Sequence, residues 1–209
     1  MNKGYFITFE GNDGCGKTTI SKLVYDKLIE LGYDVILTRE PGGIDIAEQI
    51  RDVILKPENT AMDAKTEALL YAASRRQHLV EKVLPALEKN KIVLCDRFID
   101  SSLAYQGVGR NLGIKEVLKM NEFAIEGNMP IATIFLKLSP EQGLARIASR
   151  QFKDRLDIES INFHHLVAKG YEEVVEMFQD RMQVVDASLE LNQVYESALA
   201  AVLKVIANV

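Results

Sequence analysis

The chain has 209 residues, of which 47% are hydrophobic and 26% charged, and its formal net charge is −5. This size and composition predict one globular domain over 1–209, and the acidic balance argues against general nucleic-acid binding. The chain has only two cysteines, no leader-like segment at its start and no apolar run as long as a membrane span. We therefore expect a cytoplasmic protein without disulfides or membrane contact.

In chain order, short apolar runs alternate with segments of helical periodicity. We expect strands at 5–10, 34–38, 92–95, 132–138 and 183–185. We expect helices at 17–31, 44–55, 63–89, 101–106, 115–127, 160–181 and 193–207, and another that opens at 139–141. This alternation predicts an α/β fold, with a parallel sheet covered by helices on both faces. The charged stretch 149–160 is either a solvated loop or a mobile lid.

The segment GNDGCGKT at 11–18 has the spacing of a phosphate-binding loop and stands between an expected strand and an expected helix. Backbone N–H groups of such a loop converge on phosphate oxygens, and the helix presents its positive end to them. Lys17 would reach the β- and γ-phosphates, and the Thr18 hydroxyl would hold Mg²⁺. We expect the triphosphate to contact Gly11, Asn12, Asp13, Gly14, Cys15, Gly16, Lys17, Thr18 and Thr19.

The loop alone is compatible with kinases, GTPases and ATPases. No Asn-Lys-x-Asp run for guanine is present, and the chain is small for an ATPase motor. A small phosphotransferase with a second substrate is the interpretation that we favour.

Four arginines from separate segments predict an anion site at the carboxyl end of the sheet. Arg39 and Arg97 follow two expected strands, whereas Arg51 and Arg75 lie on the helices between them. The planar guanidinium binds phosphate through two parallel hydrogen bonds. The alternative is structural: ion pairs at the strand ends and an exposed helix face.

Helical phase separates the neighbours Arg75 and Arg76. Arg76 shares a stripe with Leu69, Ala73, Val80, Val83 and Leu87, which predicts a packed or paired side chain. Arg75 shares a face with Tyr71 and His78. An aromatic ring one turn from a guanidinium suits stacking on a base and hydrogen bonding to its edge, although an exposed helix face has the same pattern.

Six segments resemble the thymidylate kinases, most closely those of Gram-positive bacteria. They are FITFEGNDGCGKTT (6–19), TREPGG (38–43), LLYAASRRQHL (69–79), DRFIDSSLAYQG (96–107), KDRLD (153–157) and VDAS (185–188). The resemblance implies a three-layer P-loop nucleoside monophosphate kinase fold with a five-stranded parallel sheet and a short lid at about 149–160. It also implies ATP-dependent, Mg²⁺-assisted phosphorylation of dTMP to dTDP, a step in dTTP synthesis. The family is dimeric, and the stripe on helix 63–89 is a candidate interface.

The resemblance further implies roles for matching residues on the acceptor side. Asp13 lies near the sugar 3′-hydroxyl, while Arg39 and Arg97 hold the dTMP phosphate and Arg97 also faces the transferring group. Tyr71 stacks on thymine, and Arg75 and Gln106 hydrogen-bond its edge, with Ser102 beside them. Tyr105 crowds the 2′ position, and Arg51 lies close to the base-side pocket.

On the donor side, the resemblance places Ala187 beside adenine, and Asp96 and Glu10 near Mg²⁺. Some thymidylate kinases carry an arginine inside the loop, where this chain has Gly14, and others supply it from the lid. We expect the second pattern here. Arg155 matches the lid motif better, Arg150 is the alternative, and Lys153 is expected to be solvated.

Two other functions compete with dTMP phosphorylation. One is a kinase for another nucleotide, such as dUMP or a different deoxynucleoside monophosphate, and the other is a nucleotide-gated binding module without turnover. A phosphate monoester has its second pKa near 6, so it is largely dianionic at pH 7 and needs no general base. The lack of an obvious catalytic base therefore agrees with a nucleotide as acceptor.

Overall fold

The computed structural model describes residues 4–148 and 154–207. Within these residues, five strands form one parallel sheet with the order β2-β3-β1-β4-β5, so the expected fold is confirmed. The strands are β1 (Tyr5–Glu10), β2 (Val35–Arg39), β3 (Ile92–Asp96), β4 (Ala132–Lys137) and β5 (Met182–Asp186). They are short runs of β-branched, aromatic and aliphatic residues, as expected for strands buried on both faces.

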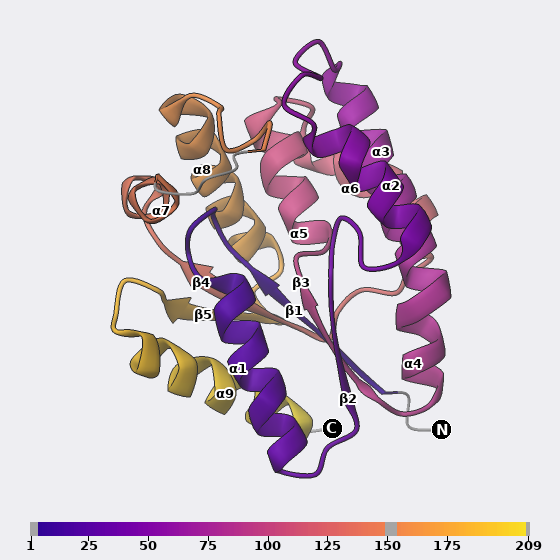
Figure 1. Cartoon of the computed structure of the whole chain (residues 1–209), viewed down its shortest axis with the longest axis vertical. Helices are drawn as coiled ribbons and strands as arrows, with labels where there is room; N and C mark the ends of the chain where they lie inside the picture. Colours follow the sequence, from indigo (N-terminus) through magenta and orange to yellow (C-terminus); the bar gives the residue numbers. More distant parts are fainter. Residues whose placement is uncertain (1–3, 149–153, 208–209) are drawn as a thin grey trace.

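Helices connect the strands and cover both faces of the sheet (Figure 1). They are α1 (Lys17–Glu30), α2 (Asp45–Leu55), α3 (Ala64–His78), α4 (Leu84–Glu88), α5 (Ile99–Ser102), α6 (Ile114–Ile125), α7 (Pro140–Ile147), α8 (Ile161–Met177) and α9 (Leu191–Ala207), with π-helical turns η1 (Leu79–Val83) and η2 (Leu103–Gly109). None of these described helices is long and apolar enough to cross a bilayer.

Two hydrophobic clusters lie on opposite faces of the sheet. On one face, α1 contributes Ile20, Val24 and Leu28, which are spaced for a single helix stripe and pack with apolar residues of α9. On the other face, the strands pack against η1, α5, η2, α6 and α8. Burial of each large aliphatic side chain contributes about 1.5–3 kcal/mol, so both helical layers are held mainly by these stripes.

The expected continuous helix over 63–89 is divided in the structure. Helix α3 ends at His78 and is followed by the π-helical turn η1 and by α4. Pro85 lies at the start of α4, has no N–H to donate to the preceding turn and would clash with that turn in a regular α-helix. A π-helical turn just before the proline relieves this conflict.

Part of the expected apolar stripe of this helix faces away from the core, although Val83, farther along it, is buried. Leu69 and Val80 are 57% and 36% exposed, respectively. Residues one position away, including Ala68 and Leu79, are buried instead. Arg76 forms an ion pair with Glu126, as expected for a paired side chain.

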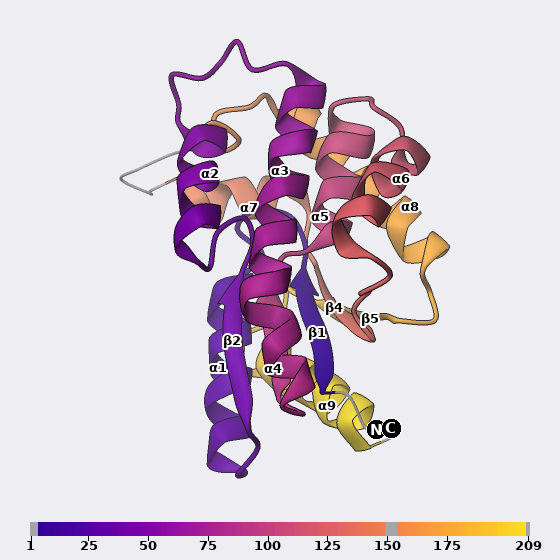
Figure 2. The same cartoon turned by 90° about the vertical axis from the view of Figure 1, so that its right-hand side faces the viewer.

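The carboxyl ends of the strands open toward the half of the molecule that holds α2, α3, α5, α7 and α8 (Figure 2). In the sheet, Phe9 of β1 lies beside Asp96 of β3, and Glu10 lies beside Phe135 of β4. The loops that leave β1, β2 and β3 therefore meet at one edge, where an open α/β sheet binds its ligands.

Candidate active site

A cavity of about 360 Å³ lies at this edge of the sheet. Its wall combines the phosphate-binding loop, the end of β2, and residues of α2, α3, α5, η2 and α7. The polar residues in the wall include Asp13, Lys17, Thr18, Thr19, Arg39, Arg51, Tyr71, Asp96, Arg97, Ser102, Tyr105, Gln106 and Arg146. Most of the residues predicted from sequence therefore meet in one space.

The phosphate-binding loop is packed directly against α7. Gly14 has a φ of 77°, and a Cβ there would lie 2.1 Å from the carbonyl oxygen of Gly143. A Cβ on Gly143 would in turn lie 2.2 Å from the carbonyl oxygen of Asp13. An arginine therefore has no room at position 14 unless α7 moves, which gives a physical reason for the glycine there.

Lys17 and Thr18 are oriented by neighbouring groups of the same loop and of β3. The Lys17 ammonium is buried and donates to the carbonyl oxygens of Gly11 and Asn12 at 2.8 and 2.9 Å. The Thr18 hydroxyl donates to Asp96 Oδ2 at 2.6 Å. Both Thr18 and Asp96 line the cavity.

The Thr18–Asp96 pair fits a Mg²⁺ ion that arrives with a triphosphate. Across 4–148 and 154–207, no group of three or more His, Cys, Asp or Glu side chains is arranged to hold a metal ion. A cation with a hydroxyl and a carboxylate beside it would complete its shell with phosphate oxygens and water, which is usual for Mg²⁺ in nucleotide sites.

Glu10, which the resemblance placed near Mg²⁺, lies beneath the cavity wall instead. Its buried carboxylate accepts hydrogen bonds from Phe98 N at 2.7 Å, Ser101 Oγ at 2.6 Å and the Tyr171 hydroxyl at 3.0 Å. Burial, followed by the charge of Asp100, raises the pKa of Glu10 to about 7. With its oxygens engaged in this way, Glu10 organises the protein around Arg97 and does not line the cavity.

Arg97 joins the two sides of the cavity. It follows β3 in a left-handed conformation, with a φ of 70°, and its guanidinium forms an ion pair with Asp13 of the phosphate-binding loop. Asp13 Oδ2 also accepts a hydrogen bond from Tyr105 at 2.7 Å. Burial raises the pKa of Asp13, but the charges of Arg97 and Lys17 outweigh it, so the net pKa is lowered and the carboxylate stays ionised.

Arg39 and Arg51 form a cationic wall at the end of β2. Arg39 pairs with Glu48 at 2.8 Å, and both arginines donate to the carbonyl oxygen of Pro41, at 3.1 and 2.9 Å. Burial and the neighbouring charge of Arg39 lower the pKa of Arg51. Both guanidinium groups line the cavity, so this wall is suited to an anion.

Tyr71, Ser102 and Gln106 line the cavity, and Arg75 lies behind them. The Arg75 side chain is 2% exposed and donates to Ser102 Oγ at 3.1 Å and to the Phe98 carbonyl oxygen at 2.9 Å. In this structure it therefore reaches the cavity through Ser102 and not directly.

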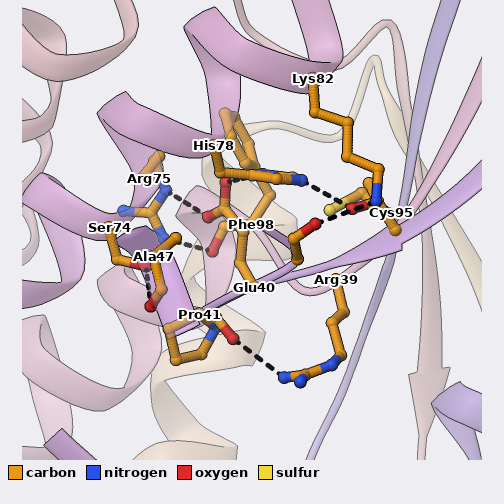
Figure 3. A network of polar contacts seen from close by, with 12 residues as sticks. Arg39, Glu40, Pro41, Ala47, Ser74, Arg75, His78, Lys82, Cys95 and Phe98 are labelled. Carbon is orange, nitrogen blue, oxygen red and sulfur yellow. Dashed lines mark hydrogen bonds and ion pairs between the residues drawn. The ribbon is translucent and has the colours of Figure 1, made fainter. Parts of the chain in front are cut away.

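Glu40 connects Arg75 to His78 in a buried chain of contacts (Figure 3). One carboxylate oxygen accepts from Arg75 Nε at 2.9 Å, and the other lies 2.9 Å from His78 Nδ1. The second ring nitrogen of His78 lies 2.7 Å from the Thr38 hydroxyl. His78 is fully buried here and holds Glu40 in place from the side opposite Arg75.

Of the two arginines expected from the lid, only Arg155 lies within the described residues, and it does not line the cavity. Arg155 is buried: it donates to the Ile54 carbonyl oxygen at 2.9 Å and pairs with Glu67 at 2.5 Å. It thereby ties this segment to α2 and α3, because Glu67 offers a buried carboxylate that needs a cation. Arg150 and Lys153 lie outside the described residues.

Two residues that the sequence analysis did not select belong to the site. Arg146 of α7 lines the cavity and donates to the carbonyl oxygen of Ala187 at 3.1 Å. Its place in the sequence just before the candidate Arg150 was the available signal. Tyr171 contacts Glu10 and Arg97 from α8, and no signal distinguished it from an ordinary core tyrosine.

The fold and the cavity define a P-loop phosphotransferase, with the phosphate-binding loop on one side of the cavity and an arginine-rich wall on the other. Residues 9–198 match the family model of thymidylate kinase. The chain belongs to the thymidylate kinase family. It is therefore an enzyme that phosphorylates dTMP to dTDP at the expense of ATP.

Relatives and a solved structure agree with this assignment. The chain is 58% identical to the thymidylate kinase of Bacillus pumilus over 201 residues, which cover 95% of each chain. It is 59% identical to that of Bacillus licheniformis, over 94% of this chain and 97% of the relative. The expected resemblance to Gram-positive enzymes is thus confirmed. The crystal structure of thymidylate kinase from Ehrlichia chaffeensis matches with a TM-score of 0.78 and 31% identity, covering 98% of this chain and 99% of that one.

Proposed function

We propose that ATP and dTMP occupy the two ends of the 360 Å³ cavity and that Arg97 acts at the point where their phosphates meet. The observation that carries this assignment is the ion pair of Arg97 with Asp13, which joins the end of β3 to the phosphate-binding loop. Phosphoryl transfer between two anionic phosphates needs positioning and charge stabilisation more than covalent chemistry.

On the donor side, Lys17 binds the β- and γ-phosphates, and the backbone N–H groups of the loop surround them. Thr18 and Asp96 hold Mg²⁺, an assignment supported by their 2.6 Å contact in the cavity wall. When bound, the ion neutralises phosphate charge. Ala187 and Arg146 flank the adenine, which is supported by their mutual hydrogen bond.

On the acceptor side, Arg39 binds the dTMP phosphate together with Arg97, and Arg51 adds positive charge beside them. Tyr71 stacks on the thymine ring. Ser102 and Gln106 meet the base edge, with Arg75 as the cation behind Ser102.

The sugar lies between Asp13, which faces its 3′-hydroxyl, and Tyr105, which crowds the 2′ position. Their 2.7 Å hydrogen bond supports a shared role at the sugar.

We also propose a homodimer through the exposed apolar residues of α3 and η1. Leu69 and Val80 face away from the core, which a second copy of the chain would cover. A cytoplasmic location is part of the proposal, and the two free, buried cysteines support a reducing compartment.

Replacing Arg97 with alanine tests the central assignment. Removing a charge that acts on the transferring group should lower kcat by about 10³-fold, measured as ADP release with saturating dTMP and ATP. A Lys115→Ala variant, which removes a cation from α6, serves as the control for general loss of charge. A loss confined to the KM for dTMP would mean that Arg97 only binds the acceptor.

A further inference from the structure

Tyr171 is a fully buried residue whose hydroxyl faces polar and charged groups of the site. It comes from α8, far along the chain from the phosphate-binding loop. The hydroxyl lies 3.0 Å from Glu10 Oε2, 3.0 Å from Ser101 Oγ and 3.4 Å from Arg97 Nη1. Tyr171 is outside the cavity wall, so it can influence the reaction only through these neighbours.

The ring of Tyr171 has little freedom to move. It stacks on Phe135 of β4, with ring centroids 5.1 Å apart, and its edge meets Tyr105 at 6.2 Å. Beside it, helix α8 runs so close to η2 that a Cβ on Gly170 would lie only 2.9 Å from Ala104. The phenol hydroxyl is thus placed by packing on both sides.

Glu10 links the Tyr171 hydroxyl to the chain segment that follows Arg97. Besides Tyr171, its carboxylate accepts from Phe98 N at 2.7 Å, and from Ser101 N at 3.2 Å and Ser101 Oγ at 2.6 Å. These donors belong to Phe98, which directly follows Arg97, and to Ser101 in the first turn of α5. The φ of 70° at Arg97 lies in the left-handed region that non-glycine residues seldom adopt. The contacts to Glu10 therefore hold a strained turn in place.

The guanidinium of Arg97 is held by the same hydroxyls. Its Nη1 donates to Ser101 Oγ at 3.1 Å and lies 3.4 Å from the Tyr171 hydroxyl. Charge stabilisation of a transferring group depends on donors that are already in place, and a shift of about 1 Å can cost about a hundredfold in rate.

We propose that Tyr171 is a positioning residue for phosphoryl transfer: its hydroxyl, with Glu10 and Ser101, fixes the guanidinium of Arg97 toward the transferring group. The inference rests on the proposed function of Arg97 at that group. Tyr171 touches neither substrate, and Arg39 also binds the dTMP phosphate, so the loss of the Tyr171 hydroxyl affects kcat much more than either KM.

The variant Tyr171→Phe removes only the hydroxyl and keeps the packed ring. We expect kcat to fall by about tenfold to a hundredfold, with both KM values within about twofold and an unchanged melting temperature. Tyr195→Phe, on α9 at the opposite face of the sheet, is the matched control and should behave as the wild type. An unchanged kcat in Tyr171→Phe would overturn the proposal.

A double-mutant cycle with Arg97→Lys separates positioning from a general structural effect. If Tyr171 acts through Arg97, Tyr171→Phe should change kcat by less than about twofold in the Arg97→Lys background. The same fold loss in both backgrounds would contradict the proposal. Should Tyr171→Phe fold poorly, Ser101→Ala removes the bridging hydroxyl and enters the same cycle.

The single variants also separate this inference from the function on which it rests. If Arg97→Lys retains full kcat, the proposed role of Arg97 is wrong, and Tyr171 has no catalytic group to position. If Arg97→Lys loses activity and Tyr171→Phe does not, Arg97 keeps its role and only the inference about Tyr171 fails.

Discussion

The hydroxyl of Tyr105 donates to Asp13 Oδ2 across 2.7 Å and so ties the acceptor pocket to the phosphate-binding loop. The ring is buried, and its edges meet the rings of Phe163 and Tyr171 at 6.1 and 6.2 Å. A ring held in this way cannot withdraw from the cavity to admit an additional hydroxyl group on the substrate.

This rigidity predicts that Tyr105 sets the preference for deoxyribose. Tyr105→Ala should narrow the ratio of kcat/KM between dTMP and ribothymidine monophosphate by about tenfold to a hundredfold, because the 2′-hydroxyl then has room. Tyr105→Phe keeps the ring and should retain the preference, while the loss of its bond to Asp13 lowers activity. Steady-state assays with the two nucleotides give this ratio of kcat/KM values. An unchanged ratio in Tyr105→Ala would show that Tyr105 does not exclude the 2′-hydroxyl.

The parts of the site that sequence predicted are those set by local chain geometry. The glycine spacing of the loop, its place between β1 and α1, and the arginines after β2 and β3 all follow from neighbouring residues and from the shared edge of a parallel sheet. The structure brings Arg97, Asp13 and Tyr105 into contact at that edge.

The parts that sequence did not predict depend on contacts between distant segments. Arg155 turns to Glu67 of α3, because that buried carboxylate requires a cation, and its sequence neighbours do not reveal this partner. Likewise, periodicity does not tell which side of helix 63–89 faces the core, since apolar residues occur on more than one of its faces. Leu69 proved exposed and Ala68 buried.

Gly143 is a second contact that only the structure reveals, and it predicts a specific effect on ATP binding. A Cβ at this position would lie 2.2 Å from the carbonyl oxygen of Asp13. Alanine normally stabilises a helix by about 1 kcal/mol relative to glycine. In Gly143→Ala, however, α7 must move away from the loop and carry Arg146 with it. We expect the KM for ATP to rise by about tenfold, with a smaller change in the KM for dTMP.

The control for Gly143→Ala is Ala145→Ser, which adds one atom on the exposed side of the same helix. Initial rates at varied ATP with saturating dTMP measure the effect. If both variants give the wild-type KM for ATP, the close approach of α7 to the loop has no bearing on nucleotide binding.

Glu67 predicts how stability depends on pH. Burial raises the pKa of its carboxyl, but the donors Gln106, Arg110 and Arg155 outweigh burial and hold the pKa below its ordinary value of 4.5. A carboxyl whose pKa is lower in the folded protein stabilises it above the unfolded value. That stability is lost as the pH falls through the folded pKa. The contribution of Glu67 is therefore complete at neutral pH and declines below about pH 4.5.

Glu67→Gln should therefore lower the free energy of unfolding by about 3 kcal/mol at pH 7, since it leaves Arg155 buried beside a neutral amide. The difference in the free energy of unfolding between Glu67→Gln and the wild type, measured by urea titration, should shrink below about pH 4.5. Glu172→Gln, which breaks the exposed pair with Lys137, should cost less than about 1 kcal/mol at any pH. If the difference between Glu67→Gln and the wild type stays constant down to about pH 3, the ionised carboxylate of Glu67 contributes nothing to stability.

The exposed apolar surface on α3, η1 and α6 predicts the oligomeric state. Phe123 of α6 is 89% exposed, and α6 packs against α3, which presents Leu69. Large apolar side chains exposed on neighbouring helices favour association with a second copy of the chain. Phe123→Asp places a charge in that contact and should convert the dimer into a monomer in sedimentation velocity runs. Leu31 lies beyond the end of α1 and is about as exposed as Leu69, so the control variant Leu31→Asp should remain dimeric. A wild-type protein that sediments as a monomer at micromolar concentration would rule out this interface.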